Sequence, residues 1–227
     1  MSSHHIVYDD QEPALIIANG ESCSNELLNQ LLEWSPLVVV LDRAIDRVLQ
    51  LGIKVDVLIG DFDRNFDYNY YKKLQYPIEI IQLEDQESYD IDKAINYLIE
   101  RKIPAANIVW ATGKRMDHTM TNITNLVKYQ EKIKLVMLDD YSKIFPLSKN
   151  FTKWYPEKTI LSLIPVGTVH KISTQNLKYE LENDSLILGF KPGSSNEVLN
   201  DGLVEITYQD GHLLLMECHD EPFGKSG

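Results

Sequence analysis

The chain has 227 residues, enough for one large domain or two modest ones, and its hydrophobic fraction of 44% is typical of a soluble globular protein. Its 34 acidic and 22 basic residues give a net charge of −12, which argues against nucleic-acid binding as the main task, because phosphate neutralisation requires clustered Lys and Arg. Two distant cysteines, no membrane-length apolar run and no secretory signal predict a cytoplasmic protein with reduced thiols.

The first 140 residues alternate between short apolar runs, which predict strands, and amphipathic stretches, which predict helices. Ser24 is a candidate N-cap and Gly52 a helix stop. This alternation predicts a parallel sheet covered by helices on both faces. The last helix is predicted to present an apolar stripe of Met116, Met120, Ile123 and Val127. The strands are predicted at 14–18, 37–41, 55–59, 78–83, 107–112 and 134–138, and the helices at 25–34, 43–52, 91–101 and 118–130.

From about residue 143 the helical spacing disappears, and short apolar runs alternate with turn signals. This pattern predicts a small antiparallel β domain. Its last strands carry consecutive apolar residues at 186–188 and 213–215, which suggests that both faces are covered. Strands are predicted at 160–165, 168–173, 177–181, 185–190, 203–208 and 212–217, and turns at 182–184, 191–196, 200–202 and 209–211. We therefore predict an α/β domain over residues 1–142, a β domain over 143–220, and a tail over 221–227.

Polar residues follow nearly every predicted strand of the α/β domain. In an open parallel sheet, ligands bind beyond the carboxyl ends of the strands. The sequence therefore predicts a ligand site at this edge of the sheet. The residues concerned are Asn19 and Gly20, Asp42, Asp61 and Asp63, Asp90, the segment 113–118, and Asp139 with Asp140.

The acids among these residues predict a magnesium site. Asp61 and Asp63 are one residue apart and repel each other unless a cation, a proton or a basic cluster neutralises them. Together with Asp42 and Asp90 they offer hard oxygen ligands, which suit Mg²⁺ bridged to substrate phosphates. A purely structural alternative is that Asp42 and Asp90 cap helices and that Asp61 and Asp63 shape a turn.

Basic and polar residues near the same edge predict phosphate contacts. Lys93 lies three residues after Asp90 at the start of a helix, where it can pair with that acid or contact a phosphate. Arg115 offers a bidentate fork for phosphate oxygens, and Asp117 is a candidate cap. His118 and Asn122 share a polar stripe, so His118 is either a base or phosphate donor, or a solvated side chain. No P-loop, G-x-G-x-x-G or protein-kinase signature is present.

Four segments in this order resemble the motifs of the thiamine pyrophosphokinase family. They are "GDFDR" (60–64), "QESYDIDKA" (86–94), "GKRMDHTMTN" (113–122), and "LKYEL" (177–181) followed by "GSSNE" (193–197). The family patterns are GDFDS, Q-D-x-T-D-x-x-K-A, GGRxDHxxxN, and G-L-K-Y/W with a [GS]-T-S-N-E turn. The chain departs from them with Arg64, Tyr89 and Lys114, and with Arg43 and Ala44 in place of two glycines after Asp42.

The resemblance implies an enzyme that transfers the pyrophosphoryl group of ATP to the hydroxyl of thiamine, giving thiamine diphosphate and AMP. It implies a homodimer with a nucleotide-binding α/β domain and a β-sandwich domain for thiamine binding and dimerisation. Asp61, Asp63 and Asp90 would hold Mg²⁺ and, with Arg115, form the catalytic set. ATP would contact Asn19, Gly20, Asp42, Gln86, Lys93, Arg115, Asp117, His118 and Asn122, and thiamine would contact Ser194, Ser195 and Asn196.

Two other functions remain open at this point. The acid-rich strand ends would also suit a Mg²⁺-dependent nucleotide phosphohydrolase. Replacement of the family glycines would suit a non-catalytic sensor of nucleotide or thiamine diphosphate. AMP release that depends on thiamine separates the first alternative from the kinase, and tight nucleotide binding without turnover identifies the second. The sequence does not indicate which group accepts the proton of the thiamine hydroxyl.

Overall fold

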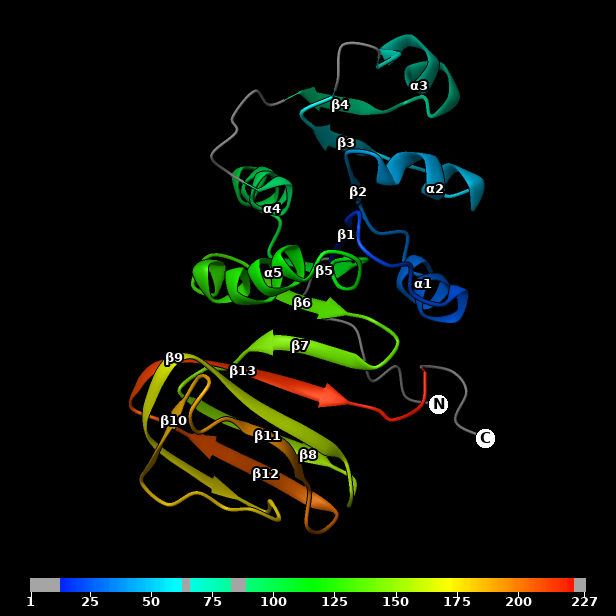
Figure 1. Cartoon of the computed structure of the whole chain (residues 1–227). Helices are drawn as coiled ribbons and strands as arrows, with labels where there is room; N and C mark the ends of the chain where they lie inside the picture. Colours follow the sequence, from blue (N-terminus) through cyan, green and yellow to red (C-terminus); the bar gives the residue numbers. More distant parts are fainter. Residues whose placement is uncertain (1–12, 63–65, 83–88, 223–227) are drawn as a thin grey trace. The chain divides into compact units, whose positions relative to one another are not determined.

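The computed structural model describes residues 13–62, 66–82 and 89–222, and the chain divides into two compact units (Figure 1). The first unit comprises residues 1–125 and 131–139, and the second comprises residues 126–130 and 140–227. Within the described part of the chain, none of the helices combines the length and apolarity that a membrane span requires.

The first unit is built on a parallel sheet with the strand order β4–β3–β2–β1–β5–β6. Every residue of β1, β2, β3 and β5 is buried. Successive side chains of a strand point to opposite faces, so the centre of the sheet is covered on both faces, as the sequence predicts. The described strands are β1 (Ala14–Ile17), β2 (Val38–Leu41), β3 (Val57–Gly60), β4 (Glu79–Gln82), β5 (Ala105–Val109) and β6 (Lys134–Leu138).

The helices of this unit follow the strands along the chain (Figure 1). Ser24 caps α1, because its side-chain oxygen accepts a hydrogen bond from the Leu27 N–H at 3.3 Å. Gly52, with φ +71°, follows α2 as predicted. The helices are α1 (Asn25–Leu32), α2 (Ala44–Gln50), α3 (Tyr68–Leu74), α4 (Asp90–Glu100) and α5 (Met116–Tyr129).

Helix α3 is not predicted from the sequence. It contains no buried residue, so it lacks the apolar stripe by which helices are recognised. Aromatic stacking secures it instead, because the Phe66 ring lies between those of Phe62 (centroids 4.1 Å apart) and Tyr71 (4.7 Å).

The predicted apolar stripe of α5 is wrong in its first turns. Met116 and Met120 are 65% and 50% exposed, whereas Thr119 is buried. The Thr119 hydroxyl donates to the carbonyls of Gly113 or Arg115, both 3.2 Å away, so a polar side chain occupies the inner face. An apolar-only pattern cannot detect such a residue.

The second unit is an antiparallel β structure around one core. Strand β9 is 16 residues long and merges the two strands predicted at 160–165 and 168–173. It pairs with β11 and β13 over its first half and with β10 and β12 further on. The described strands are β7 (Ser142–Pro146), β8 (Asn150–Tyr155), β9 (Ile160–Gln175), β10 (Asp184–Ile187), β11 (Gly193–Glu197), β12 (Gly202–Thr207) and β13 (Asp210–Cys218).

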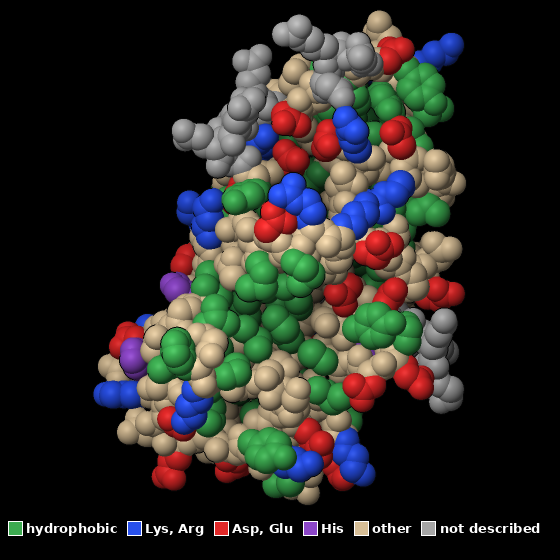
Figure 2. Space-filling view, in the orientation of Figure 1, with side chains coloured by type: hydrophobic (Ala, Val, Ile, Leu, Met, Phe, Trp, Pro, Cys, Tyr) green, Lys and Arg blue, Asp and Glu red, His purple; other side chains and the backbone are tan. Residues whose placement is uncertain are grey.

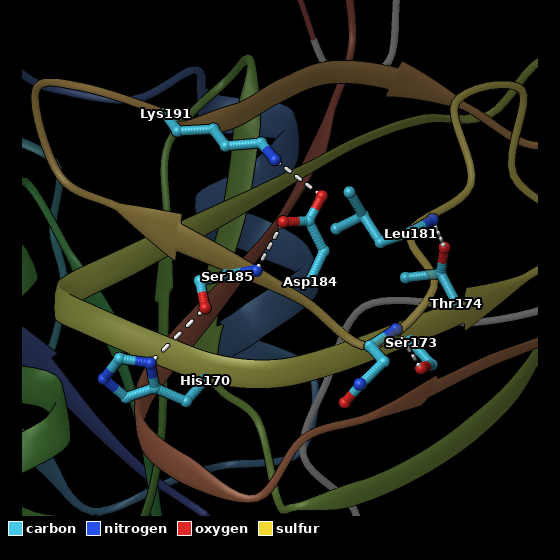
Figure 3. A network of polar contacts seen from close by, with 8 residues as sticks. His170, Ser173, Thr174, Leu181, Asp184, Ser185 and Lys191 are labelled. Carbon is cyan, nitrogen blue, oxygen red and sulfur yellow. Dashed lines mark hydrogen bonds and ion pairs between the residues drawn. The ribbon is translucent and has the colours of Figure 1, made fainter.

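Three details of this unit differ from the prediction. Strands β7 and β8 were not predicted. The turn predicted at 191–196 largely belongs to strand β11, and the strand predicted at 177–181 is irregular. Side chains from β9 explain the irregular segment (Figure 3): Thr174 Oγ1 accepts from the Leu181 N–H, and Ser173 Oγ accepts from the Asn183 N–H, both at 2.9 Å. These side-chain oxygens accept the backbone hydrogen bonds that the carbonyls of a neighbouring strand would otherwise accept.

Strand β10 is attached to its surroundings by further polar contacts in the same network (Figure 3). Asp184 Oδ2 lies 2.6 Å from Lys191 Nζ, while its other carboxylate oxygen accepts from the Ser185 N–H at 2.7 Å. The Ser185 hydroxyl contacts His170 Nδ1 at 3.3 Å. These contacts lie beside the register shift between Asp184 and Ser185 and so fix the strand where its ladder is irregular.

Candidate active site

A pocket of about 610 Å³ lies at the carboxyl ends of the parallel strands of the first unit. Figure 2 shows acidic and basic side chains gathered close together on one face of this unit. The pocket is lined by residues that follow β1, β2, β3 and β5 and by the first turns of α4 and α5, whose N-termini favour anions. Of the predicted site residues it brings together Asn19, Gly20, Asp42, Asp61, Asp90, Lys93, Arg115, His118 and Asn122.

Three carboxylates face this pocket from different segments of the chain. Burial raises the pKa of Asp42, and the negative charges of Asp90 and Asp61 raise it further, against a hydrogen bond from the Arg43 backbone. The acids therefore lie close enough to repel one another. A cation bound among them would relieve that repulsion.

Lys93 is the buried cation of the pocket. It is 7% exposed, and its Nζ lies 3.3 Å from Asp90 Oδ1. This arrangement realises the ion pair that the sequence allows. Because Lys93 also lines the pocket, its ammonium group can face a bound anion without leaving Asp90.

Arg115 and Asp117 form an exposed ion pair at the start of α5. The Arg115 Nε donates to Asp117 Oδ1 at 3.1 Å, and Nη2 donates to Asp117 Oδ2. Arg115 lines the pocket, whereas Asp117 does not. The pair holds the pKa of the Asp117 carboxyl below its usual value through the hydrogen bond from Arg115. Asp117 thus contacts the same guanidinium that the sequence predicts to bind phosphate.

His118 and Asn122 lie one turn apart on the pocket side of α5. The Asn122 Nδ2 donates to the Ala111 carbonyl at 2.8 Å and so ties the helix to the end of β5. His118 is exposed, which leaves its ring accessible from the pocket.

The turn after β1 fits tightly against the segment that follows β5. The Gly20 N–H donates to the Trp110 carbonyl at 2.5 Å, and a Cβ at Gly20 would lie 2.3 Å from the Thr112 carbonyl oxygen. No side chain fits there without movement of the backbone.

The departures from the family glycines have different consequences. Arg43 has an ordinary α-helical backbone (φ −70°, ψ −4°), and Ala44 starts α2, so neither position requires glycine. Lys114 has φ +51°, in the left-handed region that favours glycine. Its Nζ donates to the Asn19 carbonyl at 3.0 Å, which links the turns after β5 and β1.

Two predicted site residues, Asp63 and Gln86, lie outside the described residues. Among those that the structure describes, no group of three or more His, Cys, Asp or Glu side chains is arranged to hold a metal ion. Mg²⁺ is commonly bound by one or two carboxylates plus substrate phosphates and water. The donor chemistry of Asp42, Asp61 and Asp90 therefore fits Mg²⁺ bound together with a phosphorylated ligand.

The predicted thiamine residues lie on β11 of the second unit. Ser194 and Ser195 are exposed, and Ser195 has φ +56°. Asn196 is 6% exposed, and its amide hydrogen-bonds both backbone groups of Tyr179, accepting at 3.0 Å and donating at 2.8 Å. Asn196 thus fixes the backbone beside an exposed tyrosine and has little capacity left for a ligand.

Sequence reasoning missed Arg47. This half-buried residue of α2 contacts three residues of the turn after β1, and its guanidinium lies 4.5 Å from the centre of the Trp110 ring. Burial lowers its pKa. No sequence pattern could identify it, because its partners are 25 or more residues away.

An acid- and cation-lined pocket at the carboxyl edge of a parallel sheet, in a chain with a separate antiparallel β unit, defines a two-domain protein that binds phosphorylated ligands. A family model described as the catalytic domain of thiamin pyrophosphokinase matches residues 28–137, and one described as its vitamin B1 binding domain matches residues 147–213. The chain belongs to the thiamine pyrophosphokinase family and has that family's enzymatic function, that of a kinase using ATP as co-substrate.

Relatives from bacteria and plants support this conclusion. A thiamine pyrophosphokinase of Bacillus subtilis (strain 168) is 27% identical over 90% of this chain and 98% of the relative. Thiamine pyrophosphokinase 1 of Oryza sativa subsp. japonica is 30% identical over 82% of this chain and 74% of the relative.

Solved structures show the same fold. The thiamine pyrophosphokinase structure from Bacillus subtilis has a TM-score of 0.78 at 23% identity and covers 92% of this chain and 99% of that one. The yeast thiamin pyrophosphokinase structure has a TM-score of 0.80 at 21% identity and covers 93% of this chain and 88% of that one. The α/β and antiparallel β architecture is therefore shared.

Proposed function

We propose that this chain transfers the pyrophosphoryl group of ATP to the hydroxyl of thiamine in a Mg²⁺-dependent reaction, as a cytoplasmic homodimer. The observation that carries the proposal is the pocket of the first unit, where Asp42, Asp61 and Asp90 lie with Lys93 and Arg115 inside the segment matched by the catalytic-domain model. Such a mixture of acids and cations suits a metal-bound polyphosphate.

The side chains of the pocket would have different roles according to their charge. Pyrophosphoryl transfer needs alignment and charge stabilisation more than covalent catalysis. Lys93 and Arg115 would bind phosphate oxygens, with Arg115 exchanging its contact to Asp117 for the ligand. Asn19, Gly20, His118 and Asn122 would border the nucleotide. Gln86 and Asp63, which the family motifs also indicate, would complete the set.

Magnesium would be held by Asp61, Asp63 and Asp90, with Asp42 nearby. When bound, the ion would supply positive charge to the phosphates and relieve the repulsion that, after burial, raises the pKa of Asp42. The protein's part is to hold Asp42, Asp61 and Asp90 at one sheet edge and to keep Lys93 against Asp90.

Thiamine would bind with the help of the second unit, over the proposed domain 143–220. The vitamin B1 binding model matches 147–213, and "GSSNE" lies on β11 within that range. The fixed backbone of Tyr179 places an exposed ring, 64% accessible, next to this segment. Ser194 and Ser195 would offer hydroxyls to the vitamin, while Asn196 holds the segment in shape.

Exposed apolar side chains support the homodimer. In the second unit Phe190 is 88% exposed, and Trp154, Leu199 and Leu203 are each more than half exposed. Large apolar side chains in such number favour burial in an assembly. The reduced thiols of Cys23 and Cys218 fit a reducing cytoplasm, and the net charge of −12 fits partners other than nucleic acid.

The test is AMP release measured with and without thiamine, in Mg²⁺ and in excess EDTA. The proposal expects AMP only when both Mg²⁺ and thiamine are present. Equal release without thiamine would instead indicate a phosphohydrolase, and tight ATP binding without release would indicate a sensor. Undiminished activity in EDTA would overturn the metal requirement.

A further inference from the structure

Arg47 holds the turn after β1 although it does not line the pocket. Its Nη2 donates to Asn19 Oδ1 at 3.2 Å and to the Gly20 carbonyl at 2.9 Å, and its Nη1 donates to Ser22 Oγ at 3.0 Å. Asn19 and Gly20 are pocket residues. One guanidinium thus determines the shape of a stretch of pocket wall.

Two further contacts fix this arrangement. The guanidinium lies over the Trp110 ring, 4.5 Å from its centre, and Trp110 is almost fully buried. From the other side, Lys114 Nζ donates to the Asn19 carbonyl at 3.0 Å. The Asn19 backbone and side chain are therefore held by two different cations.

The chemistry of arginine decides how the Asn19 amide is oriented. A guanidinium has only donors, so the amide atom that faces it must be the oxygen. The NH₂ group, a double donor, is then directed away from Arg47. Among the described residues it makes no hydrogen bond, and Asn19 is an exposed part of the pocket wall.

We propose that Arg47 is a positioning residue that orients Asn19 so that its amide NH₂ donates a hydrogen bond to a phosphate oxygen of the bound nucleotide. This inference rests on the proposed function and adds Asn19 as a neutral donor to the cations Lys93 and Arg115. A donor held in place before binding costs no reorganisation when the nucleotide arrives.

The test compares the Michaelis constants for ATP and thiamine in Asn19→Asp and Arg47→Lys, with the melting temperature of each variant. Asn19→Asp keeps the shape and gains an ion pair with Arg47, but it replaces the donor with a negative acceptor. We expect an unchanged or higher melting temperature and a rise in the ATP constant of about tenfold or more. Arg47→Lys should raise the Michaelis constant for ATP by about fivefold, because a lysine ammonium group cannot reproduce the planar array of hydrogen bonds that the guanidinium makes to the turn after β1. The thiamine constant should stay within about twofold in both.

A double-mutant cycle separates positioning from general structural support. If Arg47 acts through Asn19, Arg47→Lys should have little further effect on the ATP constant in an Asn19→Ala background. Arg101→Lys is the matched control, since Arg101 also lies over an aromatic ring, Tyr97 at 4.6 Å, and pairs with Glu79 at 2.7 Å without lining the pocket. It should leave the ATP constant unchanged.

Additive effects in the cycle, or an unchanged ATP constant in a folded Asn19→Asp variant, would overturn the inference. If Arg47→Lys does not fold, Asn19→Asp alone decides, because its ion pair protects the fold. A wild-type protein that binds ATP and forms thiamine diphosphate, with variants that behave as wild type, refutes only this inference. A wild-type protein without thiamine-dependent turnover refutes the proposed function as well.

Discussion

Asp42, Asp61 and Asp90 come from three separate segments of the chain, yet they line one pocket. Each follows a strand or opens a helix, where a single carboxylate would serve only as a cap. Their proximity changes their chemistry. Burial raises the pKa of Asp42, and the negative charges of Asp90 and Asp61 add to this rise. This cluster of acids supports the proposed magnesium site.

Replacing Asp61 with Asn should therefore remove activity without removing the fold. Asp61 is exposed, so the amide costs little stability, but the proposed magnesium site loses one carboxylate. We expect turnover to fall by about 100-fold or more, with an unchanged melting temperature. Asp210→Asn, an exposed acid of the second unit, is the control and should behave as wild type. Unchanged turnover of Asp61→Asn at saturating Mg²⁺ would disprove the assignment.

Glu217 is a charged residue in the core of the β unit, and its surroundings shift its pKa. It is 6% exposed, and its Oε1 lies 2.6 Å from both Lys153 Nζ and Tyr155 Oη, while Lys143 Nζ lies 3.7 Å from Oε2. Burial raises the pKa of Glu217, but the ammonium groups of Lys143 and Lys153 outweigh it and leave the pKa below the usual value. The ionised form is therefore favoured by the folded state.

This lowered pKa predicts a pH-dependent contribution to stability. A carboxylate whose pKa is depressed by folding stabilises the fold above its unfolded pKa, about 4.3, and loses that contribution as the pH falls further. Glu217→Gln should lower the free energy of unfolding by about 3 kcal/mol at pH 7, with a gap to wild type that narrows below about pH 4.3. Urea unfolding across this range measures it, with exposed Glu205→Gln as control. If the difference in unfolding free energy between wild type and Glu217→Gln did not change with pH, the ionised form of Glu217 would not be what stabilises the fold.

At the scale of elements, the parallel sheet follows well from the sequence because its strands are continuous apolar runs between amphipathic helices. The β unit follows less well. The run 213–215 is fully buried as expected, but Ile187 and Leu188 are 37% and 42% exposed. Segment 177–181 has the apolar spacing of a strand, yet side chains of Thr174 and Asn196 take its backbone groups. The periodicity of a segment does not show that side chains from other parts of the chain bind its backbone groups.

The candidate site, like the fold, could be predicted only in part from the sequence. Residues at strand ends could be named from the sequence, since topology alone brings the carboxyl ends of parallel strands to one edge. Arg47 and the constraint at Gly20 could not, because both depend on the close approach of the turns after β1 and β5. The family resemblance predicts that Asn196 contacts thiamine, and this stays a prediction; the structure adds that its amide hydrogen-bonds the Tyr179 backbone, a partner that no sequence pattern indicates.

Removal of the Asn196 amide should affect the second unit and thiamine together. Asn196→Ala would remove two hydrogen bonds to the half-buried backbone of Tyr179, at a cost of about 2 kcal/mol. We expect a lower unfolding midpoint and a higher Michaelis constant for thiamine, with that for ATP within about twofold. Exposed Asn200→Ala serves as control. Wild-type thiamine kinetics in a folded Asn196→Ala variant would show that this segment does not serve the vitamin.

Over the whole molecule, the chain combines a match to a catalytic domain over residues 28–137 with a match to a vitamin B1 binding domain over residues 147–213. The exposed apolar side chains of the second unit support the proposed homodimer.

The predicted homodimer can be tested through its surface. Phe190→Asp places a charge on a side chain that is 88% exposed, so it should not disturb the core. We expect a shift from dimer to monomer in light scattering, together with weaker thiamine kinetics. Lys149→Asp, an exposed charge change elsewhere in this unit, is the control. A wild-type monomer that is fully active at catalytic dilution would contradict the assembly.

In the proposed reaction the two terminal phosphates of ATP move together to thiamine. The most direct measurement is a single-turnover reaction with ATP labelled at the γ-phosphate, with the products separated in the presence and absence of thiamine. We expect labelled thiamine diphosphate and unlabelled AMP in equal amounts, and no release of label without thiamine. Label in inorganic phosphate or pyrophosphate, released at the same rate without thiamine, would contradict it.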